Sequence, residues 1–118
     1  MNLDTEIQTH SEWKTKFRSA MRARGRFDAT TVGDDHRCPL GQWLHGAAKE
    51  KYGHLECYKV CVAEHSRFHR EAGRIAALIN DQRYVAAEEA MGMDTAYQQA
   101  SNAVVAAIMA MKRQMPQG

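Results

Sequence analysis

The chain has 118 residues, with 16 lysines and arginines against 14 aspartates and glutamates, so its net charge is only +2. This length allows one compact hydrophobic core, and we expect residues 1–118 to form a single domain. The balanced charge, without an extended basic stripe, argues against nucleic acid as a partner. The longest apolar run, Ala103 to Met111, is about half of what a bilayer requires, so we expect no membrane span.

The cysteines and the N-terminal segment indicate the compartment. Residues 1–10 carry acidic side chains and lack the apolar stretch of a secretory signal, so we expect a soluble, cytoplasmic protein. Cys38, Cys57 and Cys61 make an odd number that cannot all pair. In a reducing compartment they are expected as thiols or metal ligands, not as disulfides.

Apolar residues recur at three- and four-residue steps in the first part of the chain, as in an amphipathic helix. This first predicted helix begins at Leu3, ends near Gly25 and has His10 on its buried side. Residues 26–37 keep no such period and contain many loop formers, which predicts a connection of about a dozen residues.

Cys38 follows this connection. Pro39 directly after it suits the first position of a short helix, so Cys38 is the expected N-cap. The N-terminus of a helix lowers the pKa of a thiol. We therefore expect the pKa of the Cys38 thiol to be lowered.

The clearest register belongs to a long helix in the middle of the chain. Its predicted buried seam steps by three and four residues through Tyr58, Cys61, His65, Phe68, Ala72, Ile75 and Ile79. His69 lies at the edge of this seam. A shorter helix is expected from about Gln82 to Met91, and Asp94 or Thr95 can cap a last one.

These elements predict an all-α fold, an antiparallel four-helix bundle with a short extra helix after the Cys38 connection. No strand pattern or internal repeat is visible in the sequence. The last helix has a seam of Tyr97, Ala100, Val104, Ile108, Met111 and Met115, yet every residue from Ala103 to Met111 is apolar. A terminal helix that is apolar all round needs a second partner surface, so we expect a homodimer.

His65 and His69 are four residues apart, so both imidazoles can reach one metal ion from the same face of a helix. With His10 and Cys38 they can form a closed tetrahedral zinc site. The alternative is that each of these residues makes an ordinary hydrogen bond. The fourth ligand also stays open, because Cys61 can take the place of Cys38. His36, His45 and His54 are interpreted as surface histidines.

The sequence resembles the chemoreceptor zinc-binding domain family in three motifs. These are His10 with Trp13 and Lys14, the stretch Cys38-Pro-Leu-Gly-Gln-Trp-Leu44, and His65-Ser-Arg-Phe-His69 followed by Ala72. In order and approximate spacing they match the family from His10 to about Ser101. The resemblance implies a helical bundle, usually dimeric, that holds zinc through His10, Cys38, His65 and His69.

The chain departs from the family pattern in two respects. Pro39 stands where a basic residue is common, and Gln42 stands where lysine is frequent, so the charge around Cys38 differs. Family members are generally joined to chemoreceptors or to enzymes that make cyclic dinucleotides, and no such effector is present here. The resemblance therefore implies a sensor that acts on a signalling protein in trans.

Four protein ligands leave no open position on zinc, so we expect no hydrolytic activity and no enzyme. Such a site can report zinc availability instead, and oxidation of the Cys38 thiolate can release it. Relatives resemble sensors of zinc or of oxidants such as hypochlorous acid. Carboxylates that can hydrogen bond to a ligand imidazole are Asp28, Asp34 and Asp35.

Two other functions remain open. A hemerythrin-like di-iron carrier shares the bundle, but it needs bridging carboxylates, and the long helix offers few besides Glu64 and Glu71. A metal-free dimerisation module requires only that the histidines pack in the core.

Overall fold

The computed structural model describes residues 1–115, and every regular element in that part of the chain is an α-helix. The prediction of an all-α fold is confirmed. No helix among these residues is both long and apolar enough to cross a bilayer. The predicted domain extends to residue 118, so its last three residues lie outside the described part.

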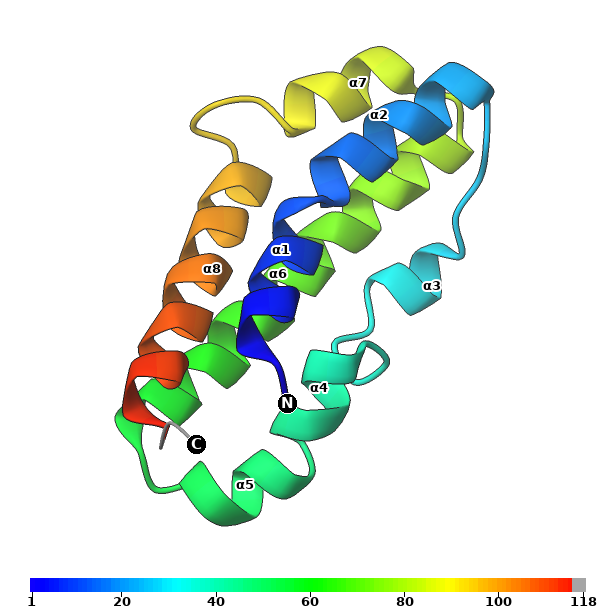
Figure 1. Cartoon of the computed structure of the whole chain (residues 1–118). Coiled ribbons are helices and arrows are strands. Elements are labelled where there is room, and N and C mark those ends of the chain that lie inside the picture. Colours follow the sequence, from blue (N-terminus) through cyan, green and yellow to red (C-terminus); the bar gives the residue numbers. More distant parts are fainter. Residues whose placement is uncertain (116–118) are drawn as a thin grey trace.

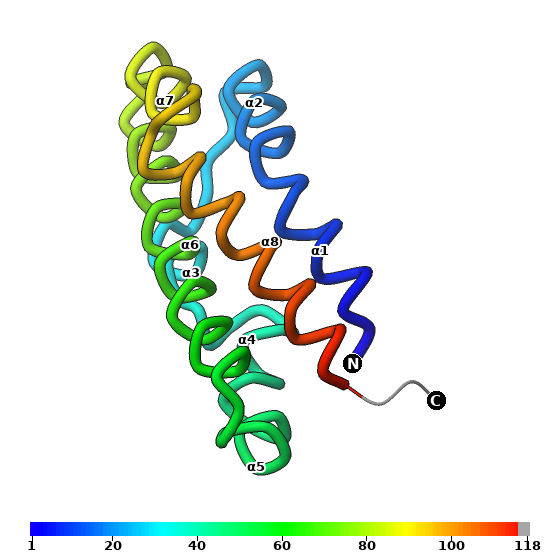
Figure 2. The backbone as a smooth tube through the Cα atoms, turned by 90° about the vertical axis from the view of Figure 1, so that its left-hand side faces the viewer, coloured from blue at the N-terminus to red at the C-terminus, as the bar shows by residue number. Residues whose placement is uncertain are grey.

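Three long stretches of helix lie side by side (Figures 1 and 2). They are α1 (Leu3–Ser11) followed by α2 (Trp13–Ala23), then α6 (Glu56–Asn80), and α8 (Ala96–Gln114). α8 runs antiparallel to the other two stretches (Figure 1). The side chains most deeply buried between them are Phe17, Phe68, Ile75, Ile79, Val104, Ile108 and Met111.

The predicted first helix is present as α1 and α2, which meet at Glu12. At this point the Ser11 hydroxyl donates a hydrogen bond to the carbonyl oxygen of Ile7 at 2.7 Å. Side-chain bonds of this kind bend helices, which accounts for the division that the apolar pattern did not reveal. α2 ends with Arg24 in the left-handed conformation (φ 55°), next to the predicted end at Gly25.

The segment between the first and the long helix contains more helix than its sequence predicts. α3 (Ala29–Val32) lies within the predicted connection, and α5 (Ala47–Tyr52) follows the predicted short helix, α4 (Pro39–Leu44). α3 has four residues and α5 has six, too few for a hydrophobic period to show. All three pack on α6 (Figure 1). α3 does so beside His69 and Gly73, past the middle of that helix.

The long helix and the last helix agree with the predicted register. Every residue of the predicted α6 seam is buried. Thr95 is the N-cap of α8, because its hydroxyl accepts a hydrogen bond from the Gln98 backbone N–H at 3.2 Å. The helix expected from Gln82 to Met91 is the shorter α7 (Tyr84–Ala90), which packs on α6.

α3 contacts α6 where two glycines meet. A Cβ atom added to Gly73 would lie 2.9 Å from the Cα atom of Gly33, closer than real Cβ atoms approach another atom. Only hydrogen fits at position 73 while α3 keeps its place. This close approach brings the carbonyl oxygen of Val32 to the ring of His69.

Replacement of Gly73 by alanine tests this contact. The added methyl group should push α3 away from α6 and reduce the free energy of unfolding by about 1–3 kcal/mol, as overpacking typically does. Thermal unfolding followed by circular dichroism measures the loss. Gly25→Ala is the matched control, since a Cβ there meets no atom closer than 3.7 Å. Equal melting temperatures for the two variants would contradict the account.

Candidate metal centre

Four side chains from three separate stretches of the chain meet beside α6. They are His10 from α1, Cys38 from the turn before α4, and His65 and His69 from α6. One donor atom from each lies within 4.8 Å of the others, so the group is able to hold a metal ion. All four residues selected from the sequence are therefore brought together.

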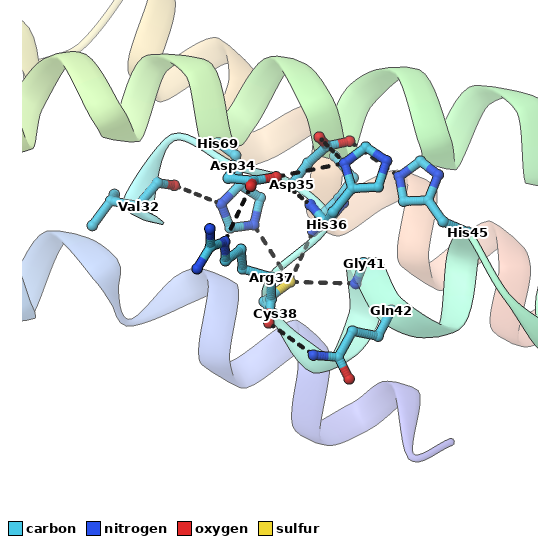
Figure 3. Close-up of polar contacts among 11 residues, drawn as sticks. Val32, Asp34, Asp35, His36, Arg37, Cys38, Gly41, Gln42, His45 and His69 are labelled. Atoms are coloured by element: carbon cyan, nitrogen blue, oxygen red, sulfur yellow. Dashed lines mark hydrogen bonds and ion pairs between the residues drawn. The ribbon is translucent and has the colours of Figure 1, made fainter. Parts of the chain in front are cut away.

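The sulfur atom of Cys38 faces all three imidazoles. Its distances to the Nε2 atoms are 3.2 Å for His65, 3.5 Å for His69 and 3.9 Å for His10. In a tetrahedral zinc site with ordinary bond lengths, sulfur and nitrogen ligands are about 3.5 Å apart. The spacing in this cluster thus fits an ion placed between the four donors. Figure 3 shows Cys38 facing the His69 ring.

Backbone carbonyls orient two of the rings. The Nδ1 atom of His10 lies 2.7 Å from the carbonyl oxygen of Glu6, and that of His69 lies 2.8 Å from the carbonyl oxygen of Val32. A carbonyl oxygen can only accept, so the proton of each neutral ring is on Nδ1. The Nε2 lone pair of each ring is left free for a metal ion, as in known zinc sites.

His65 differs from the other two histidines. Its ring is fully buried, and its Nδ1 atom has no hydrogen-bond partner in the structure. Only its Nε2 atom makes a polar contact, with the sulfur of Cys38. The position of this ring is therefore set by packing and by whatever its Nε2 atom binds.

Burial keeps the three imidazoles neutral. Desolvation lowers the pKa of His10 to about 4 and that of His65 to about 2, and it also lowers the pKa of His69. Phe68 contributes to this dry environment, since its ring centre lies 5.5 Å from those of His10 and His69. Neutral imidazole is the form that binds a metal ion.

Cys38 is the N-cap of α4, as predicted, because its sulfur accepts a hydrogen bond from the Gly41 backbone N–H at 3.3 Å. The predicted lowering of its pKa is wrong. Burial raises the pKa of the thiol by more than the N–H groups of Gly41 and Leu40 lower it. At neutral pH the sulfur is a thiol unless a cation stabilises the thiolate.

The other candidate ligands do not join the cluster. Cys61, the alternative fourth ligand, is buried in the core cluster, and Cys57 is partly buried against it. Glu64 and Glu71 pair with arginines one helical turn further along α6. The carboxylates that a di-iron site needs are thus not part of this cluster.

None of the predicted loop carboxylates forms a hydrogen bond to a ligand imidazole. Asp28 caps α3, Asp34 accepts hydrogen bonds from His36 and Arg37, and Asp35 faces His36 and His45. The groups that hold the imidazoles are main-chain carbonyls, which a sequence does not identify. The spacing of Glu6 and His10, four residues apart on one helix, is the only signal of this kind.

Glu6 was not identified from the sequence. Its side chain is buried beside α4, and one carboxylate oxygen has no hydrogen-bond partner among residues 1–115. Burial raises the pKa of this carboxyl group, and a hydrogen bond from the Leu40 backbone N–H opposes the shift. Through its carbonyl and its carboxyl group, Glu6 connects His10 to the first turn of α4.

The fold and the cluster together define a helical protein with a buried three-histidine, one-cysteine group. The family model described as chemoreceptor zinc-binding domain matches residues 10–76, more than half of the chain. The chain belongs to this family. The match contains all four residues of the cluster and ends in α6, before Ser101, where the resemblance seen in the sequence ends. No curated protein and no solved structure matches the chain.

The lowered pKa values predict how the metal-free protein responds to acid. The unfolded chain binds protons at His10, His65 and His69 near pH 6.5, whereas the folded chain does not. Stability should be greatest above that pH and fall below it, by about 2 kcal/mol between pH 6.5 and 5 for each of His10 and His65, with a further loss from His69.

Urea unfolding in the presence of a chelator, at a series of pH values, measures how the free energy of unfolding changes with pH. His54→Gln is the control, since His54 is exposed and outside the cluster, and its slope should equal that of the wild type. A free energy of unfolding that stays constant from pH 7 to 5 would show that the histidines are not buried as neutral groups.

Proposed function

We propose that this chain is a sensory domain, not an enzyme, and that it binds one Zn²⁺ ion through His10, Cys38, His65 and His69. The state of this site changes the packing of the helices that supply the ligands. Membership of a zinc-binding family and the geometry of the cluster support the proposal.

The observation that carries the proposed zinc site is the convergence of three Nε2 atoms on a single sulfur. His10 and His69 donate a hydrogen bond through Nδ1, so the Nε2 atom of each carries a lone pair that needs a proton donor or a cation. The Cys38 thiol has one proton to give. It can satisfy one of these lone pairs, and burying the other without a partner costs about 1–3 kcal/mol. One zinc ion satisfies every donor atom together.

The same observation disfavours the other functions. In a metal-free dimerisation module the Nε2 lone pairs of His10 and His69 would each need an ordinary donor, and the single thiol proton of Cys38 cannot supply both. A di-iron carrier needs carboxylates, and the cluster contains none. A closed site with four protein ligands also leaves no position for an activated water, which argues against hydrolysis.

The ligands connect parts of the fold that are distant in sequence. α1 packs on α8, α4 packs on α6, and the cluster joins α1 and α4 to α6. Loss of the ion would remove the link from Cys38 to α1 and α6, and the contacts of Glu6 and Gly41 with this turn would remain. Occupancy of the site can thus change how the Cys38 turn and α1 pack against α6.

Oxidation of Cys38 is a second signal to which the zinc site responds. Its side chain is half-buried and, with His69, lines a cavity of about 160 Å³, a size that admits a small oxidant. Hypochlorous acid converts a thiolate to a sulfenic acid and releases chloride, with sulfur oxidised and chlorine reduced by two electrons. A sulfenic acid is a weaker zinc ligand, so oxidation would release the ion and the turn.

The proposal includes a homodimer formed through the outer face of α8. One side of this helix is buried in the core. On the other side Val105, Ala106 and Met109 line a groove together with Ser11, Gln98, Ser101 and Asn102, and Met109 is 44% exposed. Small apolar side chains allow a second helix to approach closely. The effector would be a cytoplasmic signalling protein that binds the dimer in trans.

Elemental analysis of desalted protein tests the zinc site. Wild type should retain about one zinc per chain, because four protein ligands bind tightly. His65→Ala and Cys38→Ala should lose it, whereas Cys57→Ala, the matched thiol control, should keep it. Zinc-free wild type, or equal zinc in His65→Ala and wild type, would contradict the proposal.

The same zinc-loaded samples test the redox input. Equimolar hypochlorous acid should release most of the zinc to a chromogenic chelator, equally in wild type and in Cys57→Ala. Circular dichroism recorded in parallel should show a change in helix content or thermal stability. If wild type retains its zinc, or if only Cys57→Ala is resistant, Cys38 is not the switch.

A further inference from the structure

A second group of metal-binding side chains lies at the surface beside α4. It consists of Asp35, His36 and His45, and one donor atom from each lies within 4.8 Å of the others. Figure 3 shows the two imidazole rings next to each other near the carboxylates of the loop. The sequence indicates only two separate surface histidines, and the fold brings them together. His36 precedes Cys38 in the chain, and His45 is the C-cap of α4.

The carboxylate of Asp35 faces both rings. Its Oδ1 atom lies 3.2 Å from Nδ1 of His36, and its Oδ2 atom lies 3.3 Å from Nε2 of His45. Charge-assisted hydrogen bonds are shorter, about 2.7–2.9 Å. The oxygen and nitrogen ligands of a tetrahedral ion with ordinary bond lengths are about 3.3 Å apart. Each of the two separations is close to that of two ligands on one ion, and each ring faces a different oxygen of the carboxylate.

The two rings lie face to face. They stack with their centres 3.8 Å apart and their planes inclined by 14°. Each ring has one nitrogen near the Asp35 carboxylate. An imidazole binds a metal ion in the plane of its ring, so one of the two stacked rings must turn before both can bind the same ion, and the exposed His36 ring has the room to do so. The backbone around them is fixed, because the carbonyl oxygen of Asp35 packs on Gly41, where a Cβ atom would lie 1.7 Å from it. The backbone at Asp35 is thus held in place before any ion arrives, and binding requires a turn of the His36 side chain.

We propose that Asp35, His36 and His45 form a second binding site, for a divalent transition-metal ion such as Zn²⁺. Two imidazoles and one carboxylate are a donor set that zinc and similar ions accept. Three protein ligands leave a position for water, and the side chain of His36 is 64% exposed. The ion at this outer site is therefore held more weakly than one held by the buried cluster, and it exchanges with solvent.

Asp34 contributes charge to the outer site but not a fourth ligand. Its Oδ1 atom lies 3.5 Å from Nδ1 of His36 and accepts a hydrogen bond from the His36 backbone N–H. Its Oδ2 atom pairs with Arg37 at 3.2 Å. Both oxygens are already engaged, so Asp34 adds negative potential that favours a cation nearby.

Competitive titration of metal-free wild type with Zn²⁺ tests the outer site. The binding curve should contain two classes of ion, one tight and one weaker. His36→Gln should weaken the second class at least tenfold and leave the tight class unchanged, and His45→Gln should do the same. His54→Gln, which changes an exposed histidine outside both clusters, should leave both classes intact. Far-ultraviolet circular dichroism checks that each variant is folded.

Absorption spectra recorded with Co²⁺ in place of Zn²⁺ distinguish the two sites. The tight ion should show a thiolate-to-metal charge-transfer band, and the weaker ion should add none, because the outer site has no sulfur. His65→Ala should lose the tight class and keep the weaker one. Tight binding alone in wild type, or a weaker class that persists in both His36→Gln and His45→Gln, overturns the outer site and leaves the zinc sensor intact. Weak binding alone in wild type overturns the sensor and leaves the outer site intact.

Discussion

The structure depends on three uncharged imidazoles that point at one sulfur atom inside a helical core. Each of His10, His65 and His69 is almost fully buried, and their pKa values are lowered by that burial. Neutral rings repel one another only weakly, and their lone pairs attract a cation. Protonated rings at these distances would repel one another strongly. A buried cluster of this kind is compatible with a compact fold when a proton donor or a metal ion lies at its centre.

The surrounding helices supply what this cluster needs. α6 provides two ligands on one face, since residues four apart on a helix are neighbours. The main-chain carbonyls of Glu6 and Val32 fix the tautomers of His10 and His69, and the glycine contact between α3 and α6 allows Val32 to come near enough. Cys38 is delivered by a helix N-terminus that also donates N–H groups to its sulfur. Metal binding, the order of the Cys38 turn and the packing of the helices around it are thus coupled.

Features that depend on periodicity or on a local motif were predictable from the sequence. The α6 seam, the Cys38 N-cap and the four clustered residues all follow from spacing or from the family resemblance. Short helices such as α3 and α5 were not predictable, because they contain too few residues to show a pattern. The raised pKa of Cys38 also escaped prediction, because burial depends on tertiary packing, which outweighed the effect of the helix N-terminus.

X-ray absorption at the zinc K edge, on protein desalted to one ion per chain, tests the central claim most directly. The account predicts three nitrogen ligands at about 2.0–2.1 Å and one sulfur ligand at about 2.3 Å. A first shell of nitrogen and oxygen alone, or one with two or more sulfur atoms, would contradict it, because the cluster contains a single cysteine.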